Sequence, residues 1–145
     1  MRVVLDTNVL LQGLKNKNGA SGFILENIRS YHLELMISIP VFSEYQDVLL
    51  RKSSLKFLGA SKLDIEKILD FIAFIASPAE INFLMRPNLK DESDNMFVDL
   101  AFASRANFLI TSNVKDYNSS PELLFDSFKI ILPTNFAILW RKLHE

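Results

Sequence analysis

The stretch RVVLDTN at residues 2–8 decides the fold class of this chain. Its apolar run predicts a buried strand, in which an interrupting charge would cost free energy. Asp6 escapes that cost because it closes the strand, and in open α/β sheets the carboxyl ends of the strands face the ligand crevice. The same residue could instead cap the helix that the apolar positions from Val9 to Leu14 predict. At this point Asp6 is either a functional carboxylate or an N-cap.

Strand and helix patterns alternate along the rest of the chain. Apolar runs predict strands at residues 2–6, 33–37, 81–84, 107–111 and 129–132. Helical patterns lie between and after them, and we expect Phe71 and Phe74 of one helix in the core, with a partner surface as the alternative. Alternating βα units favour the α/β class, as a three-layer α/β/α sandwich with a parallel sheet of four or five strands. Residues 1–145 are expected to form a single domain.

Composition narrows the classes of function. The chain has no cysteine, which excludes disulfides, thiolate zinc sites and a cysteine nucleophile. Its two histidines, His32 and His144, form no metal-binding motif. A net charge of −1 predicts no broad basic surface, so contact with nucleic acid would be local or metal-mediated. Because we find neither a signal-peptide pattern nor a run long enough to span a membrane, we expect a cytoplasmic protein.

Acidic residues stand where such a sheet would bring them together. They are, in chain order, Asp6, Glu44, Asp94 and Asp116. Each has another explanation, as a helix cap, a first-turn acid or a turn residue. Converging carboxylates repel one another unless a divalent cation or a proton offsets them, and Mg²⁺ prefers oxygen ligands. The set therefore indicates phosphodiester chemistry with magnesium or manganese.

The chain resembles the PIN-domain family, in particular the VapC-type toxin ribonucleases of bacterial and archaeal toxin–antitoxin systems. The matching segments are Val4–Leu10, Ser38–Pro40 with Glu44 and residues 48–49, Asp91–Ala106, Leu109–Thr111 and Pro133–Phe136. They span nearly the whole chain. The resemblance implies the strand order 3-2-1-4-5, with the switch point between the strands that end at Asp6 and Thr111.

By resemblance, three acidic residues form the centre of the site and hold Mg²⁺ or Mn²⁺ directly or through water: Asp6, Glu44 and Asp94. Three further residues are implied as its supports, namely Thr7, Asn8 and Thr111. The neighbouring acids Asp91 and Glu92 are expected to lie outside this group or at its rim.

The fourth acidic position is where this chain departs from the family. Many relatives have an aspartate where Asn113 stands, whereas Asp116 three residues later is similar to another branch. Asn113 can offer a carbonyl oxygen or orient water but brings no charge. The fourth role stays open between Asn113 and Asp116.

The activity implied by the resemblance is that of a metal-dependent endoribonuclease, which leaves a 3′-hydroxyl and a 5′-phosphate. Its implied partners are an RNA substrate and a protein antitoxin, and exposure of Phe71 or Phe74 would favour a homodimer. An alternative, favoured by Asn113, is a catalytically weak PIN scaffold that binds RNA or a protein. A phosphatase of the haloacid-dehalogenase type is disfavoured, because its second aspartate would stand where the chain has Asn8.

Overall fold

The computed structural model describes residues 1–81, 92–117 and 127–144, with the backbone alone for residues 92–94. The strands in this part of the chain are β1 (Arg2–Leu5), β2 (Glu34–Ile37), β3 (Ser77–Pro78), β4 (Phe108–Ile110) and β5 (Lys129–Ile131). The helices are α1 (Thr7–Lys15), α2 (Ala20–Arg29), α3 (Ile39–Leu49), α4 (Lys52–Leu58), α5 (Lys62–Ile75), α6 (Glu92–Ala103), α7 (Val114–Tyr117) and α8 (Pro133–Leu143). None of the described helices is both long and apolar enough to cross a membrane.

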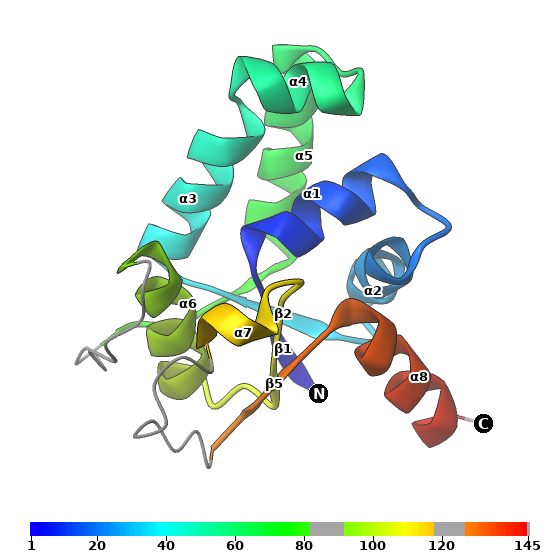
Figure 1. The fold of residues 1–145 in the computed structure, drawn as a ribbon. Helices are drawn as coiled ribbons and strands as arrows, with labels where there is room; N and C mark the ends of the chain where they lie inside the picture. Colours follow the sequence, from blue (N-terminus) through cyan, green and yellow to red (C-terminus); the bar gives the residue numbers. More distant parts are fainter. Residues whose placement is uncertain (82–91, 118–126, 145) are drawn as a thin grey trace.

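The strands form one parallel sheet in the order β3-β2-β1-β4-β5 (Figure 1). This order confirms the predicted α/β fold and places the switch point between β1 and β4. β1 lies in the middle of the sheet, where Val3, Val4 and Leu5 have no exposed surface. An uninterrupted apolar strand is what a parallel sheet covered on both faces requires.

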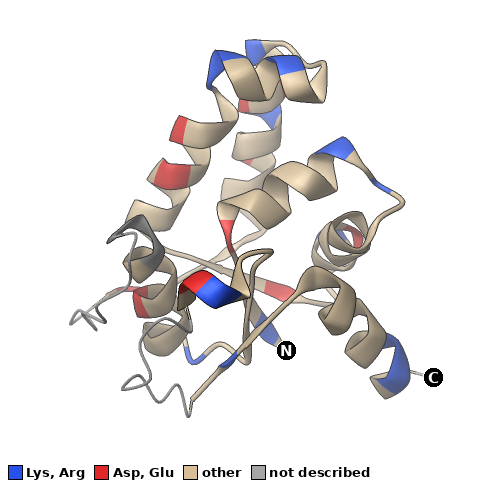
Figure 2. Cartoon of the chain, viewed as in Figure 1, with Lys and Arg blue, Asp and Glu red and all other residues tan. Residues whose placement is uncertain are grey.

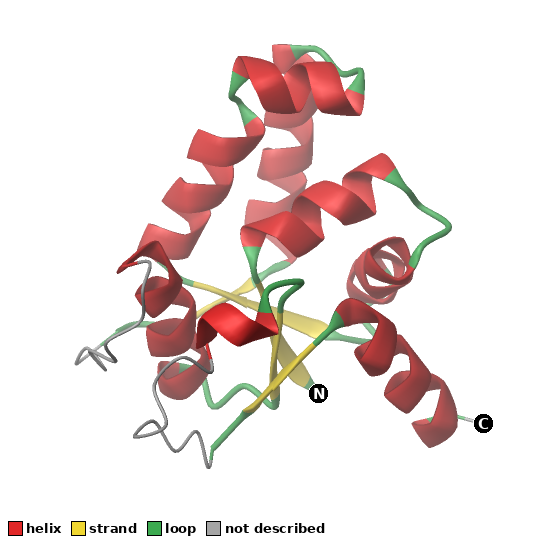
Figure 3. Cartoon of the chain, in the orientation of Figure 1, coloured by secondary structure: helices red, strands yellow, loops and turns green. Residues whose placement is uncertain are grey.

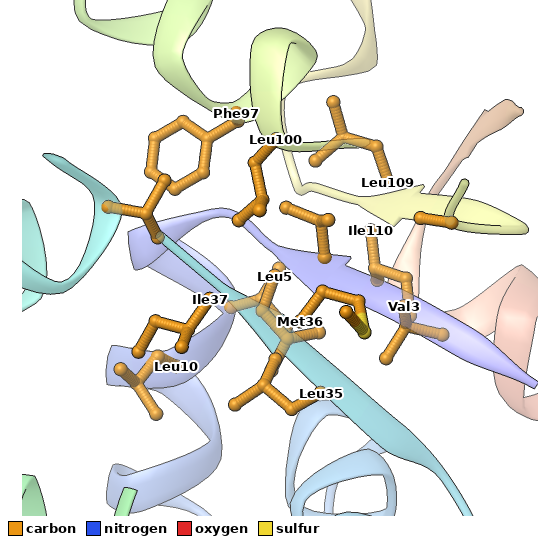
Figure 4. Close-up of a cluster of buried hydrophobic side chains, with 14 of the residues drawn as sticks. Val3, Leu5, Leu10, Leu35, Met36, Ile37, Phe97, Leu100, Leu109 and Ile110 are labelled. Carbon is orange, nitrogen blue, oxygen red and sulfur yellow. The ribbon is translucent and has the colours of Figure 1, made fainter. Parts of the chain in front are cut away.

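Helices pack on both faces of the sheet (Figure 3). α6 contacts β1, β2 and β4. Figure 4 shows Phe97 and Leu100 of α6 on one side of these strands and Leu10 of α1 on the other. All three side chains are buried. The core therefore extends through the sheet and joins the two helical layers.

The helix starts follow local capping chemistry. The Ser38 hydroxyl accepts a hydrogen bond from the N–H of Val41 at the start of α3, where Pro40 occupies the first turn. Ser61 and Asp64 form a reciprocal capping box at the start of α5. These caps fix where each helix leaves the preceding segment.

The structure also contains elements that were not predicted, and it corrects one expectation about the core. The edge strand is β3, at Ser77–Pro78, which was not predicted. Of the strand predicted at 81–84, Ile81 is described and is not in a strand, whereas residues 82–84 lie outside the described residues. The short helices α4 and α7 were not predicted. Phe71 and Phe74 are not core residues, because 45% and 78% of their surfaces are exposed.

Candidate active site

Asp6 lies at the junction of β1 and α1, beside the switch point of the sheet. Its side chain is buried, with 7% of its surface exposed. Oδ1 accepts a hydrogen bond from the backbone N–H of Thr7 at 2.8 Å, which caps α1. Oδ2 accepts hydrogen bonds from the hydroxyls of Thr111 at 2.7 Å and Tyr117 at 3.0 Å. Asp6 is thus an N-cap, and two hydroxyls from other elements also fix its carboxylate.

The Asp6 carboxylate keeps capacity for one more ligand. A carboxylate offers about four lone-pair sites on its two oxygens. Donors from the described residues occupy both sites on Oδ2 and one on Oδ1. The remaining lone-pair site, on Oδ1, can accept another hydrogen bond or coordinate a cation.

The loop after β4 is built around Thr111, which is fully buried. Its hydroxyl donates to Asp6 and accepts a hydrogen bond from the N–H of Asn113 at 3.0 Å. The carbonyl of Asn113 in turn accepts from the N–H of Asp116 at 3.0 Å, within the turn that starts α7. α7 then returns Tyr117 to Asp6. The backbone of Asn113 thus links Thr111 to the segment that carries Asp116.

Asn8 holds the same loop from the other side. Its Oδ1 accepts a hydrogen bond from the N–H of Ser112 at 3.2 Å, which joins the first turn of α1 to the loop after β4. The neighbouring Thr7 has a buried hydroxyl that finds no hydrogen-bond partner among the described residues. Asn8 and Thr7 therefore differ: the side chain of Asn8 braces the loop, whereas Thr7 contributes its backbone N–H to Asp6.

Glu44 lies on α3 and is half-buried, so it is not sealed in the apolar core. The next residue, Tyr45, is fully buried and donates its hydroxyl to the carbonyl of Leu5 at 2.6 Å. This bond ties α3 to the end of β1, one residue before Asp6. Figure 2 shows acidic segments on α3, on α7 and at the start of α1. Tyr45 therefore fixes the helix that carries Glu44 beside the junction that carries Asp6.

Burial is the largest influence on Asp6 and raises the pKa of its carboxyl above the ordinary value of 3.8. The hydrogen bonds from Thr111, Tyr117 and the Thr7 backbone lower the pKa, because they favour the charged form. The negative charge of Asp116 raises the Asp6 pKa further. Asp116 is therefore close enough for the two carboxylates to repel each other. A bound cation would offset this repulsion.

The acidic residues around the start of α6 are only partly described. Asp91 lies outside the described residues, and for Glu92 and Asp94 the structure describes the backbone in the first turn of α6 but not the side chains. Among the described residues there is no group of three or more histidine, aspartate or glutamate side chains that could hold a metal ion. The convergence of Asp94 with Asp6 and Glu44 stays a prediction.

Sequence reasoning missed the two tyrosines, Tyr45 and Tyr117, and two buried polar residues of α6, Asn95 and Asp99. The tyrosines lie at apolar positions and carry no sequence signal for their hydrogen bonds. Asn95 and Asp99 did have a signal, because they are four residues apart on one face of α6 and are the two polar residues in the otherwise apolar stretch 95–103.

Comparison with known proteins relates this chain to one domain family and to a solved structure of similar fold. A family model of the PIN domain matches residues 2–115. The uncharacterized protein MJ1680 of Methanocaldococcus jannaschii is 30% identical over 121 residues, which cover 80% of this chain and 72% of that protein. A chain in the crystal structure of VapBC2 from Rickettsia felis, bound to a DNA fragment from their promoter, is similar in fold, with a TM-score of 0.55 and 19% identity over 91% of this chain and 98% of that one. This chain belongs to the PIN-domain family.

Proposed function

We propose that this chain is an endoribonuclease that hydrolyses RNA phosphodiester bonds with Mg²⁺ or Mn²⁺. The observation that carries the proposal is the Asp6 carboxylate, which three donors orient at the switch point of a parallel sheet. Ligands bind at this position in open α/β sheets. Membership of the PIN-domain family supports the proposal, because PIN domains are generally nucleases.

The donor set at this edge of the sheet suits a hard cation. Asp6 and Asp116 are carboxylates, and the surrounding side chains that bond to Asp6 offer oxygen rather than sulfur or imidazole. We propose that Asp6, Glu44, Asp94 and Asp116 hold the cation, with Asp116 rather than Asn113 as the fourth acid. The electrostatic effect of Asp116 on Asp6 supports that choice, whereas Asn113 bonds to its described neighbours through its backbone N–H and carbonyl.

A cation bound there would polarise the scissile phosphate and lower the pKa of an attacking water. In the hydrolysis a water oxygen adds to phosphorus and the P–O3′ bond breaks, which leaves a 3′-hydroxyl and a 5′-phosphate. Thr111 and Tyr117 keep Asp6 Oδ2 occupied, so that Oδ1 is the oxygen left to face the reaction. The hydroxyl donors also favour the ionised form of Asp6 that a cation requires.

Cleavage of end-labelled RNA by the purified protein tests this function. We expect cleavage with Mg²⁺ or Mn²⁺, none in EDTA, and products with a 5′-phosphate. Asp6→Asn keeps the shape of the side chain and removes its charge, so it should abolish cleavage without unfolding the protein. Asp70→Asn, an exposed aspartate on α5, is the matched control and should cleave like the wild type. Cleavage by Asp6→Asn at the wild-type rate would contradict the proposal, and RNA binding without any cleavage would favour a PIN scaffold.

We further propose that the protein acts in the cytoplasm, as the toxin of a toxin–antitoxin pair. The likeness in fold to a chain of VapBC2 supports a protein antitoxin as partner. An apolar groove between α1, α2 and α5, lined in part by Leu10, Leu25 and Phe71, supports a partner that covers it. The test is a small reading frame beside the gene, whose product should co-purify with this chain and suppress RNA cleavage. A product that does neither would contradict the toxin role.

The exposed rings of Phe71 and Phe74 on α5 also support a homodimer. Light scattering of the purified chain would measure its mass. We expect a dimer that Phe74→Ser weakens, and a monomer at all concentrations would contradict this expectation.

A further inference from the structure

A cluster of exposed cations lies on and around α4, and we call it the basic end. Residues 51–63 contain no acidic residue and four basic ones, which are Arg51, Lys52, Lys56 and Lys62. All four are exposed. Figure 2 shows basic segments on α4. Because the whole chain has a net charge of −1, this segment is a local concentration of positive charge.

Acidic neighbours compensate only part of this charge. Arg51 pairs with Asp47 at 2.9 Å, and Lys62 lies 3.9 Å from Glu66, both between exposed side chains. Exposed pairs of this kind contribute little and are screened by salt. By contrast, no carboxylate of the described residues lies within 4.0 Å of Lys52 or Lys56.

Lys52 and Lys56 also repel each other. They are four residues apart on α4, so their side chains share one face of the helix. Like charges at this spacing destabilise a helix by a few tenths of a kcal/mol. An anion that binds beside both lysines would relieve this repulsion, and the relief would add to the free energy of binding.

An aromatic ring borders the lysines. Phe57 of α4 is 40% exposed, and the ammonium group of Lys15 at the end of α1 lies 5.2 Å from its ring centroid. An exposed ring beside clustered lysines is the combination that single-stranded nucleic acids bind, because a base can stack where phosphates are neutralised. The chemistry therefore fits RNA better than a purely anionic partner.

The basic end lies within reach of the candidate active site. α3 begins after β2, at the carboxyl edge of the sheet, and its other end leads into α4 (Figure 1). With 11 residues at about 1.5 Å each, α3 is about 16 Å long. Glu44 and Tyr45 lie midway along it. An RNA strand that extends along α3 from Asp6 would thus reach α4.

We propose that the basic end, centred on Lys52 and Lys56, binds the phosphate backbone of the RNA substrate outside the catalytic centre. This inference rests on the proposed function for the identity of the RNA as substrate. It predicts that the basic end contributes to affinity and to its salt dependence, and not to the chemical step.

The test compares two double variants that remove the same charge. Lys52→Gln/Lys56→Gln changes the basic end, and Lys129→Gln/Lys142→Gln changes exposed lysines of β5 and α8. Glutamine matches lysine in helix propensity, so the fold of α4 should persist, which circular dichroism would verify. The first measurement is binding of a labelled single-stranded RNA in EDTA at a series of salt concentrations. Loss of two phosphate contacts should reduce the slope of log affinity against log salt by about 1.4 for the basic-end variant.

The second measurement is cleavage of the same RNA with Mg²⁺. We expect KM to rise several-fold for the basic-end variant with kcat unchanged, and both constants to stay near wild type for the control. Equal slopes of log affinity against log salt for the two double variants would refute RNA binding by the basic end, even if the wild type cleaves RNA. A slope difference between them without cleavage by the wild type would retain the surface and refute the nuclease function instead.

Discussion

Replacing Tyr117 by phenylalanine removes the hydroxyl that donates to Asp6 Oδ2 at 3.0 Å and leaves the buried ring in place. A hydrogen bond to a charged group contributes about 1.5–3 kcal/mol to stability. With an unfolding entropy of about 2.1 cal/mol/K per residue, each kcal/mol lowers the Tm of a 145-residue chain by about 3 °C. Tyr117→Phe should therefore lower the Tm by about 5–10 °C at neutral pH in EDTA.

The stability that Tyr117→Phe loses relative to the wild type should depend on pH. Burial raises the pKa of Asp6 above 3.8, and the Tyr117 hydroxyl opposes that rise. A carboxyl whose pKa is higher in the folded state than in the unfolded state stabilises the fold at a pH below its unfolded pKa of 3.8. This stabilisation is lost as the pH rises through the pKa of the folded state. Without the Tyr117 donor the Asp6 pKa rises further, so more stability is lost. The difference between wild type and Tyr117→Phe should thus widen from acidic to neutral pH.

Urea unfolding across that pH range in EDTA provides the free energies. Tyr31→Phe is the control, because 70% of Tyr31 is exposed and removal of its hydroxyl should change stability little at any pH. A loss for Tyr117→Phe that is the same at every pH would refute the view that the hydroxyl supports the charged form of Asp6. No loss at all would refute the hydrogen bond.

Two more predictions test how the site is held. Tyr45→Phe leaves the buried carbonyl of Leu5 without its 2.6 Å donor, so we expect about 1–3 kcal/mol lower stability, measured by urea unfolding, and a higher Mg²⁺ concentration for half-maximal cleavage, measured by metal titration; unchanged stability would contradict the tie between α3 and β1. Asp116→Asn should lower metal affinity and activity more than Asn113→Ala in Mg²⁺ titrations of cleavage at fixed salt; a loss confined to Asn113→Ala would reverse the assignment.

The central part of the fold could be predicted because it depends on short-range patterns. Val3–Leu5 of β1 and the whole of β4 are continuous apolar runs, and an alternating βα order favours a parallel sheet. In such a sheet, residues that follow neighbouring strands meet at one edge. The 2.7 Å hydrogen bond between Asp6 and Thr111, which are 105 residues apart, is the result of that geometry.

Other features depend on tertiary contacts that no local pattern records. β3 is a two-residue strand at Ser77–Pro78, and its pairing with β2 rather than its own composition makes it a strand. The helical period of α5 places Phe71 and Phe74 on an apolar face but does not say that the face is exposed. Tyr117 looks like a core aromatic residue until α7 brings its hydroxyl to Asp6. The end of α4 did have a signal in Gly59, whose φ of 62° marks a left-handed helix C-cap.

The most direct test of the proposed site is the position of a bound cation. Crystals of the protein grown with Mn²⁺ would locate it by anomalous scattering. We predict one strong peak at the switch point, about 2 Å from Asp6 Oδ1 and in contact with the carboxylates of Glu44, Asp94 or Asp116 directly or through water. We also predict that the peak is lost in Asp6→Asn. No peak at Asp6 in a protein that cleaves RNA with Mn²⁺, or a peak that persists in Asp6→Asn, would contradict the account.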